Sequence, residues 1–131
     1  MKPMSVLISG IDGFSASNVK KFLHKSKINS LGISRRYKKK KIIKWDLIKK
    51  NNRKIKLKID WIIHIAAIHK IQDFLKNNNN KRKNILMTKN LIEFAKKNHI
   101  KKFIFFSTID ISNDKVFGNK RDYNLSKLKS E

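Results

Sequence analysis

Two side chains near the C-terminal end of the sequence have the types and the spacing that proton transfer needs. Tyr123 and Lys127 are four residues apart, so on a helix they would lie on the same face. An ammonium group beside a phenol stabilises the phenolate, and a tyrosine in that setting can act as a general acid or base. Such a pair is also common on solvated helix surfaces. A catalytic pair is favoured here because it follows an apolar segment that ends near Thr108.

A second group, near the start of the chain, suits the binding of phosphate. Residues 6–16 (VLISGIDGFSA) join a β-branched run to a turn with two glycines, and apolar residues then recur at helical spacing. Gly10 allows a sharp turn, and Gly13 allows the backbone to approach a pyrophosphate closely. Ala16 is small enough for a helix to pack on the strand, and the N-terminus of that helix presents free N–H groups to phosphates. The segment therefore predicts a dinucleotide-binding turn.

The elements that must position these groups alternate along the chain. Strands are expected near residues 5–9, 28–33, 42–45, 60–67 and 102–107, and helices near residues 15–24, 84–98 and from 123 onward. This alternation predicts right-handed βαβ units, a parallel sheet and an α/β fold. The run at 61–67 is apolar almost throughout, as in strands buried on both faces. Residues 49–58, rich in Lys and Asn, are expected to form a loop or a poorly packed helix.

The composition bounds the class of protein. The 131 residues suffice for one core, and without a repeat or a Pro/Gly-rich linker they predict a single domain over residues 1–131. The sequence has no cysteine, which excludes disulfides, thiolate metal sites and thiol nucleophiles. No apolar stretch reaches the roughly 20 residues of a membrane span, and the first strand begins too early for a signal peptide. We therefore expect a cytoplasmic protein with no membrane partner.

The net charge of +24 has two possible meanings. Lys, Ile and Asn can all be encoded by A/T-only codons, so an AT-rich genome would produce this excess of lysine. Such a charge would also attract polyanions, and a basic polyanion-binding protein remains an alternative. Specific readers of nucleic acid usually add arginine or stacking aromatics, and only five of the 33 basic residues are arginine. We expect no specific nucleic-acid partner. No metal site is expected at His64 and His69, since no Asp, Glu or Cys cluster accompanies them.

Five segments, taken in order, resemble one family. Residues 9–14 (SGIDGF) are similar to its Thr-Gly-x-x-Gly-Phe-Ile-Gly turn, with Ala16 in place of the last glycine, and residues 60–67 (DWIIHIAA) to its Asp-x-Val-x-His-x-Ala-Ala strand. Residues 84–88 (NILMT) are similar to its Asn-Val-x-Gly-Thr helix, residues 103–108 to its strand that ends in the active-site Ser/Thr, and residues 123–127 (YNLSK) to its Tyr-x-x-x-Lys motif. The chain thus resembles the N-terminal half of an extended short-chain dehydrogenase/reductase, of the NAD(P)-dependent epimerase/dehydratase type.

This resemblance implies both a fold and a chemistry. The fold would be a Rossmann-type, doubly wound parallel sheet of about five strands in the order 3-2-1-4-5. The activity would be that of an epimerase, dehydratase or reductase, with hydride transfer on a nucleotide-sugar or similar carbonyl or alcohol substrate. Tyr123 would be the acid/base. Lys127 would also hold the nicotinamide ribose, and Thr108 would orient the reacting carbonyl or alcohol. Asp110 would either touch a sugar hydroxyl or only begin a loop.

The residues and the resemblance together assign a cofactor site. Its members are Gly10, Asp12, Gly13, Phe14, Arg35, Arg36, Asp46, Leu47, Ala66, Ala67, Asn84, Tyr123 and Lys127. No acid follows the second strand to bind a ribose 2′-OH, and Arg35 and Arg36 could accommodate a 2′-phosphate, so NADP is favoured over NAD. The alternative is that both arginines belong to the general basic surplus. Asp46 resembles the family's contact to adenine, or is a turn or cap residue.

The family continues beyond the Tyr-x-x-x-Lys helix with further parallel strands and a small substrate domain. We therefore expect the Rossmann domain to be incomplete at its C-terminal end, the substrate domain to be absent and this chain to be inactive by itself. A non-catalytic NADP-binding module and an inactive gene fragment are the alternatives. Members of the family are often homodimers.

Overall fold

The computed structural model describes residues 4–52, 54–77, 79–108 and 121–131. In chain order the elements are β1 (Ser5–Ser9), α1 (Phe14–Lys25), β2 (Asn29–Ser34), β3 (Ile42–Lys44), β4 (Trp61–His64), α2 (Ile71–Lys76), α3 (Asn80–Lys97), β5 (Lys102–Phe105) and α4 (Arg121–Ser130). The strands form a parallel sheet in the order β3-β2-β1-β4-β5. This confirms the predicted doubly wound α/β fold and its strand order.

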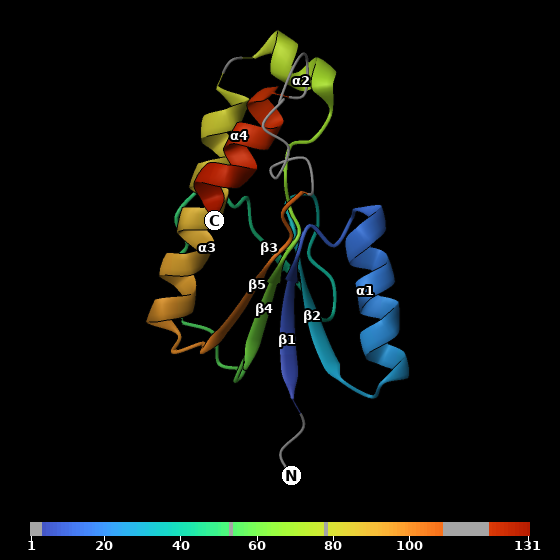
Figure 1. Cartoon of the computed structure of the whole chain (residues 1–131). Coiled ribbons are helices and arrows are strands. Elements are labelled where there is room, and N and C mark those ends of the chain that lie inside the picture. Colours follow the sequence, from blue (N-terminus) through green and yellow to red (C-terminus); the bar gives the residue numbers. More distant parts are fainter. Residues whose placement is uncertain (1–3, 53, 78, 109–120) are drawn as a thin grey trace.

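Helices cover both faces of the sheet, with α1 on one side and α3 and α4 on the other (Figure 1). The central strand β1 supplies both cores, because successive side chains of a strand point to opposite faces. Leu7 packs in the cluster that contains Leu91 of α3, whereas Val6 and Ile8 pack in the cluster that contains Ala16 of α1. All five of these side chains are nearly or fully buried. The small Ala16 lies against the sheet, as predicted.

Strand β4 is shorter than the predicted strand at 60–67 and ends at His64. The N–H groups of Ile65 and Ala66 donate to the Ser9 hydroxyl oxygen, at 3.0 and 3.1 Å. They are therefore satisfied by a side chain of β1 and do not continue the sheet. An apolar pattern indicates burial but not backbone pairing. The apolar run here continues beyond His64, where the backbone stops pairing with the neighbouring strands.

Other boundaries also differ from the predictions. Strand β5 ends at Phe105, and α3 begins at Asn80, earlier than the predicted start at residue 84. The short helix α2 was not predicted. The described part of residues 49–58 forms neither helix nor strand, which agrees with the first of the two predicted alternatives, a loop, and not with a poorly packed helix. Among the described residues, no helix combines the length and the apolar character that a membrane crossing requires.

Helix α3 fastens the connecting segments through asparagine side chains. Four asparagines of α3 and its C-terminal cap bond to backbone groups outside the helix: Asn80 to Asp73, Asn84 to Ile68, Asn90 to Leu47 and Ile48, and Asn98 to Ile55. A loop carries backbone donors and acceptors that strands and helices would otherwise satisfy, so each amide replaces part of that bonding. The two loops that follow β3 and β4 are thereby held against the same helix.

Candidate functional site

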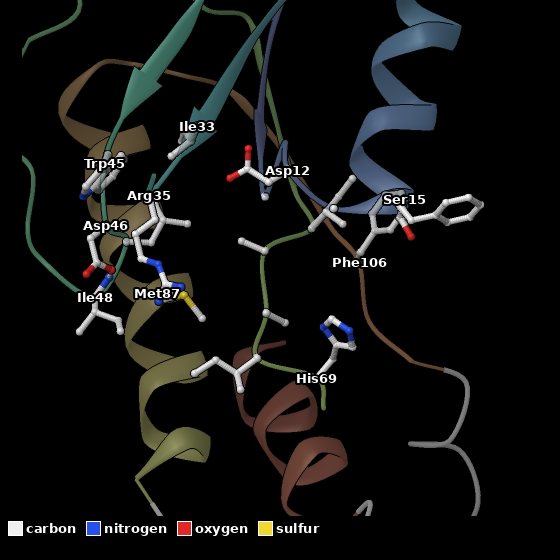
Figure 2. Close-up of a pocket in the computed structure, with 18 of the residues that line it drawn as sticks. Asp12, Ser15, Ile33, Arg35, Trp45, Asp46, Ile48, His69, Met87 and Phe106 are labelled. Atoms are coloured by element: carbon white, nitrogen blue, oxygen red, sulfur yellow. Dashed lines mark hydrogen bonds between the residues drawn. The ribbon is translucent and has the colours of Figure 1, made fainter. Parts of the chain in front are cut away.

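A cavity of about 570 Å³ opens at the carboxyl ends of the strands, between the glycine turn and α4 (Figure 2). In an open parallel sheet this edge, where the strand order reverses, is where ligands bind. The predicted site residues that line the cavity are Gly10, Asp12, Gly13, Phe14, Arg35, Arg36, Asp46, Leu47, Ala66, Ala67, Tyr123 and Lys127. Asn84 and Thr108 are not among its lining residues.

The glycine turn is shaped by two close approaches. Gly10 has a φ of +74°, and a Cβ there would lie 2.9 Å from the backbone of Ala66. A Cβ at Gly13 would lie 3.2 Å from the carbonyl oxygen of Gly10, which accepts the Gly13 N–H at 2.9 Å. Gly13 is also the N-cap of α1 and has no side chain to cap it. The first N–H groups of α1 are thus left for a ligand, and this arrangement fits an anion such as a pyrophosphate.

The end of β2 is organised by one buried hydroxyl. Ser34 Oγ donates to Asp12 Oδ2 at 2.8 Å and accepts the backbone N–H groups of Arg36 and Tyr37, at 3.1 and 3.4 Å. Asp12 also raises the pKa of Tyr37, with hydrogen bonding as the largest cause. Arg35 points into the cavity from the same turn (Figure 2). The prediction singled out Asp12 and the arginines but missed Ser34, which connects them.

Asp46 and its neighbours form the wall after β3. Asp46 Oδ1 accepts the N–H of Ile48 at 3.2 Å, as a turn-capping aspartate does, and the residue also lines the cavity. Trp45 lines the cavity as well and donates from its indole nitrogen to the Lys49 carbonyl oxygen, at 2.7 Å. Neither Trp45 nor Ile48 was predicted as a site residue. Their closeness in sequence to the predicted residues Asp46 and Leu47 was the signal that could have identified them.

Helix α4 brings Tyr123 and Lys127 to the opposite wall. The Lys127 ammonium lies 5.9 Å from the centre of the Tyr123 ring and 4.7 Å from that of Phe105, and it donates to the Phe106 carbonyl oxygen at 2.6 Å. Only 4% of Lys127 is exposed, and burial lowers its pKa to about 8. The two residues share one face of α4, as their spacing predicted.

A chain of buried polar side chains lies behind this wall. His64 Nδ1 is 2.7 Å from Ser9 Oγ, and its Nε2 is 3.0 Å from Thr88 Oγ1. Because Ser9 Oγ already accepts two N–H groups, its own proton goes to Nδ1. His64 then carries its proton on Nε2 and donates to Thr88, which donates to the Asn84 carbonyl oxygen at 3.2 Å. Burial and, secondarily, the Lys127 charge lower the pKa of His64 to about 3. The imidazole is therefore neutral at physiological pH.

The side chain of Asn84, on α3, links this series of buried polar groups to α4. Its Oδ1 accepts the N–H of Ile68 at 2.8 Å, and its Nδ2 donates to the Ile68 carbonyl oxygen and to Ser126 Oγ, at 2.9 and 3.0 Å. Both amide protons are thus engaged within the protein. Ser126 in turn donates to the Tyr123 carbonyl oxygen at 2.6 Å. Asn84 lies behind the cavity, where it joins the loop after β4 to the helix that carries Tyr123.

The remaining predicted residues are placed as follows. Thr108 lies beyond the end of β5, half-buried, and its neighbour Ser107 is the hydroxyl residue that lines the cavity. The Ser107 hydroxyl contacts the Glu131 carboxylate. Asp110 lies outside the described residues. His69 lines the cavity, but no group of three or more His, Cys, Asp or Glu side chains suited to a metal occurs in the described ranges.

The chain is similar in sequence to one protein family and in fold to several solved structures. The family model for the NAD dependent epimerase/dehydratase family matches residues 6–131. No curated protein matches the sequence. Among solved structures, the UDP-glucose 4-epimerase from Bifidobacterium longum in complex with NAD+ and UDP is similar, with a TM-score of 0.78 and 21% identity, over 97% of this chain and 47% of that one.

Two further structures give the same result. The UDP-Glc/GlcNAc 4-epimerase from Campylobacter jejuni has a TM-score of 0.75 and 22% identity, over 97% of this chain and 46% of that one. MoeE5 in complex with UDP-glucose and NAD has a TM-score of 0.75 and 21% identity, over 96% and 46%. At these identities the likeness shows the fold. The chain spans less than half the length of each of the three.

Proposed function

The chain belongs to the NAD-dependent epimerase/dehydratase family, and from this premise we propose that it is the cofactor-binding half of a hydride-transferring enzyme. Its cofactor would be NADP in preference to NAD, and its substrate a nucleotide-sugar or a similar carbonyl or alcohol compound. One observation carries the proposal. Tyr123 and Lys127 line the same cavity as the turn from Gly10 to Gly13, from the opposite wall.

The residues present fit a dinucleotide. The uncapped N-terminus of α1 would hold the pyrophosphate, because its N–H groups and the helix dipole favour an anion. Gly13 would let the phosphates approach the backbone of the turn with no side chain between them. Asp46 and Leu47 would contact the adenine, and Arg35 and Arg36 the 2′-phosphate. When bound, the nicotinamide accepts or returns a hydride at the substrate carbon.

The proton that accompanies the hydride is assigned to Tyr123. Its phenolate would take the proton from the substrate hydroxyl, and its phenol would return it. The Lys127 ammonium would stabilise that phenolate, while the Phe106 carbonyl oxygen, 2.6 Å away, holds it in place. Since burial lowers the pKa of Lys127 to about 8, the ammonium form is lost as the pH rises through that value. Proton transfer by Tyr123 would therefore weaken above about pH 8. Thr108, which directly follows the cavity-lining Ser107, would orient the reacting carbonyl or alcohol.

Binding of the dinucleotide is the direct test of this proposal, because it needs only the described half of the fold. We expect calorimetric titration of the chain to give a tighter Kd for NADP+ than for NAD+. In a double variant, Arg35→Ala with Arg36→Ala, NADP+ binding should weaken by about 1.5–3 kcal/mol for each lost charge-assisted bond. NAD+ binding should change much less.

A matched control separates this contact from the general positive charge. Lys38→Ala with Lys40→Ala removes the same charge from exposed residues of the same segment that do not line the cavity. This variant should retain the preference for NADP+. Equal affinity of the wild type for both dinucleotides would contradict the NADP assignment, and absence of binding to either would contradict the proposed function.

A further inference from the structure

We propose that Asp12 is a specificity-determining residue for the adenosine ribose of the cofactor. Its carboxylate would accept hydrogen bonds from the ribose hydroxyls and repel a 2′-phosphate, in opposition to Arg35 and Arg36. The inference rests on the proposed function and deepens it. The preference between NADP and NAD then depends on opposed charges, one carboxylate and two guanidinium groups, that line the same cavity from the ends of different strands.

No acidic residue directly follows β2 in the sequence, but the fold brings the carboxylate of Asp12 to the end of this strand. Asp12 belongs to the glycine turn after β1, and the hydroxyl of Ser34, the last residue of β2, donates to its Oδ2 at 2.8 Å. The turn is also held against β2 by its backbone, because the Ile11 N–H donates to the Ile33 carbonyl oxygen at 3.3 Å. The carboxyl end of β2 is where this fold class places the ribose of a dinucleotide.

This close approach depends on Gly32. A Cβ at Gly32 would lie 2.7 Å from Cγ1 of Ile11, so only a glycine lets the turn come this near to β2. The side chain of Ile11 occupies that space and is 7% exposed. The residue after Ile11 is Asp12, and its carboxylate is thereby delivered to the strand end.

The carboxylate is oriented by the Ser34 hydroxyl. Ser34 is 1% exposed, and its hydroxyl has no capacity left, because it donates to Asp12 and accepts from the N–H groups of Arg36 and Tyr37. Asp12 also raises the pKa of Tyr37, with hydrogen bonding as the largest cause. Asp12 itself is exposed and lines the cavity. A carboxylate accepts about four hydrogen bonds, so lone pairs remain for ribose hydroxyls.

The charge of Asp12 is available to a ligand. Among the described residues no ion pair joins Asp12 to an arginine, although Arg35 and Arg36 line the same cavity. A like charge brought next to a 2′-phosphate costs binding energy, whereas ribose hydroxyls gain a charged acceptor. Asp12 should therefore limit the preference for NADP that the two arginines create.

Titration of Asp12→Asn with NADP+ and NAD+ tests this inference, because the amide keeps the size of the side chain and an oxygen for Ser34. We expect the ratio of NADP+ to NAD+ affinity to rise about tenfold, from tighter NADP+ binding and weaker NAD+ binding. Asp12→Ala should shift the ratio in the same direction. Glu93→Gln removes the same charge from a residue outside the cavity and should leave the ratio as in the wild type.

The outcomes distinguish the two levels of the proposal. An unchanged ratio in both Asp12 variants, with the wild type binding either dinucleotide, overturns the role of Asp12 and leaves the proposed function standing. The same holds if Glu93→Gln shifts the ratio as much as Asp12→Asn does. A wild type that binds neither dinucleotide overturns the proposed function and this inference with it.

Discussion

The two walls of the cavity are built from different kinds of contact. On the wall formed by β4, α3 and α4, the polar residues His64, Asn84, Ser126 and Lys127 expose 1%, 4%, 0% and 4% of their surface. On the wall formed by the glycine turn and the end of β2, Asp12, Arg35 and Arg36 are exposed. The buried Ser34 bonds to the Asp12 carboxylate and to the backbone N–H of Arg36.

The difference teaches which properties of the site are fixed and which are adjustable. A buried polar group must keep its partners, because an orphaned donor or acceptor costs about 1–3 kcal/mol. The position of Tyr123 and Lys127 is therefore tied to the stability of the fold. An exposed carboxylate or guanidinium can be exchanged at little cost to folding. If the proposed function holds, the wall of β4, α3 and α4 (the α4 wall) would set the geometry for proton transfer. The wall of the glycine turn and the end of β2 (the β2 wall) would set the choice of cofactor.

Asn84→Leu should have the largest effect, because it removes the partner of the part-buried N–H and C=O of Ile68 and of the buried Ser126 hydroxyl. We expect the free energy of unfolding to fall by about 3–4 kcal/mol, measured by urea unfolding followed by circular dichroism. Asp12→Asn on the other wall should cost less than about 1 kcal/mol. Equal costs for the two variants would break the comparison.

Gly10→Ala tests the close contact between the glycine turn and the backbone of Ala66, after β4. The positive φ disfavours an L side chain, and the new Cβ would meet the Ala66 backbone at 2.9 Å. We expect a loss of about 2–3 kcal/mol in the same unfolding assay. Gly13→Ala, where φ is −87° and the nearest atom lies at 3.2 Å, should cost less than about 1 kcal/mol. Similar losses at both glycines would show that the contact with Ala66 does not matter.

Acid should weaken the α4 wall through His64. The pKa of this imidazole is lowered from 6.5 to about 3, so between these values the unfolded chain binds a proton that the folded chain does not. Stability should therefore fall as the pH decreases from about 6.5 toward 3, by at most about 1.4 kcal/mol per pH unit. Urea unfolding between pH 7.5 and 5, in steps of roughly half a unit, measures this slope before most carboxylates titrate. His64→Gln should have a shallower slope, and identical slopes would contradict a neutral His64.

The smallest effect is expected at the exposed ion pair between α3 and α4. Lys81 Nζ lies 3.5 Å from Asp122 Oδ1, and the two side chains are 34% and 50% exposed. Asp122→Asn should change the unfolding free energy by less than about 0.5 kcal/mol, and added salt should reduce even that. Ser126→Ala, at the buried contact between the same helices, should cost about 1–2 kcal/mol. A larger loss at Asp122 than at Ser126 would reverse the comparison.

The sequence predicted the β2 wall and the order of the strands better than it predicted the α4 wall. The parallel sheet follows from the alternation of strands and helices, its strand order was implied by the family resemblance, and Gly10, Gly13 and Arg35 do line the cavity. The role of Asn84 was not accessible in the same way. Its amide bonds to Ile68 and to Ser126, which lie 16 and 42 residues away, and no local pattern reports such a contact.

The same limit explains the errors at element ends. The apolar run after His64 predicted a longer β4, because hydrophobicity does not record that the Ser9 hydroxyl takes the next two N–H groups. The asparagines of the chain looked like a compositional surplus. Three of them, Asn84, Asn90 and Asn98, bond to the backbone of loops 16 to 43 residues earlier, and Asn80 bonds to the backbone of α2.

These asparagine contacts can form only after a long stretch of the chain has been synthesised. Asn90 and Asn98 hold the backbone at Leu47 and Ile55, in each case 43 residues earlier in the chain. A ribosome adds about 5–20 residues per second, so each loop waits about 2–9 s for its partner to be made. During that interval the loop after β3 has only water for those backbone groups. On the β2 wall the wait is shorter, since the bonded residues Asp12 and Ser34 are only 22 residues apart. The contact between Ser34 and Asp12 can therefore form on the nascent chain before the contacts that Asn90 and Asn98 make.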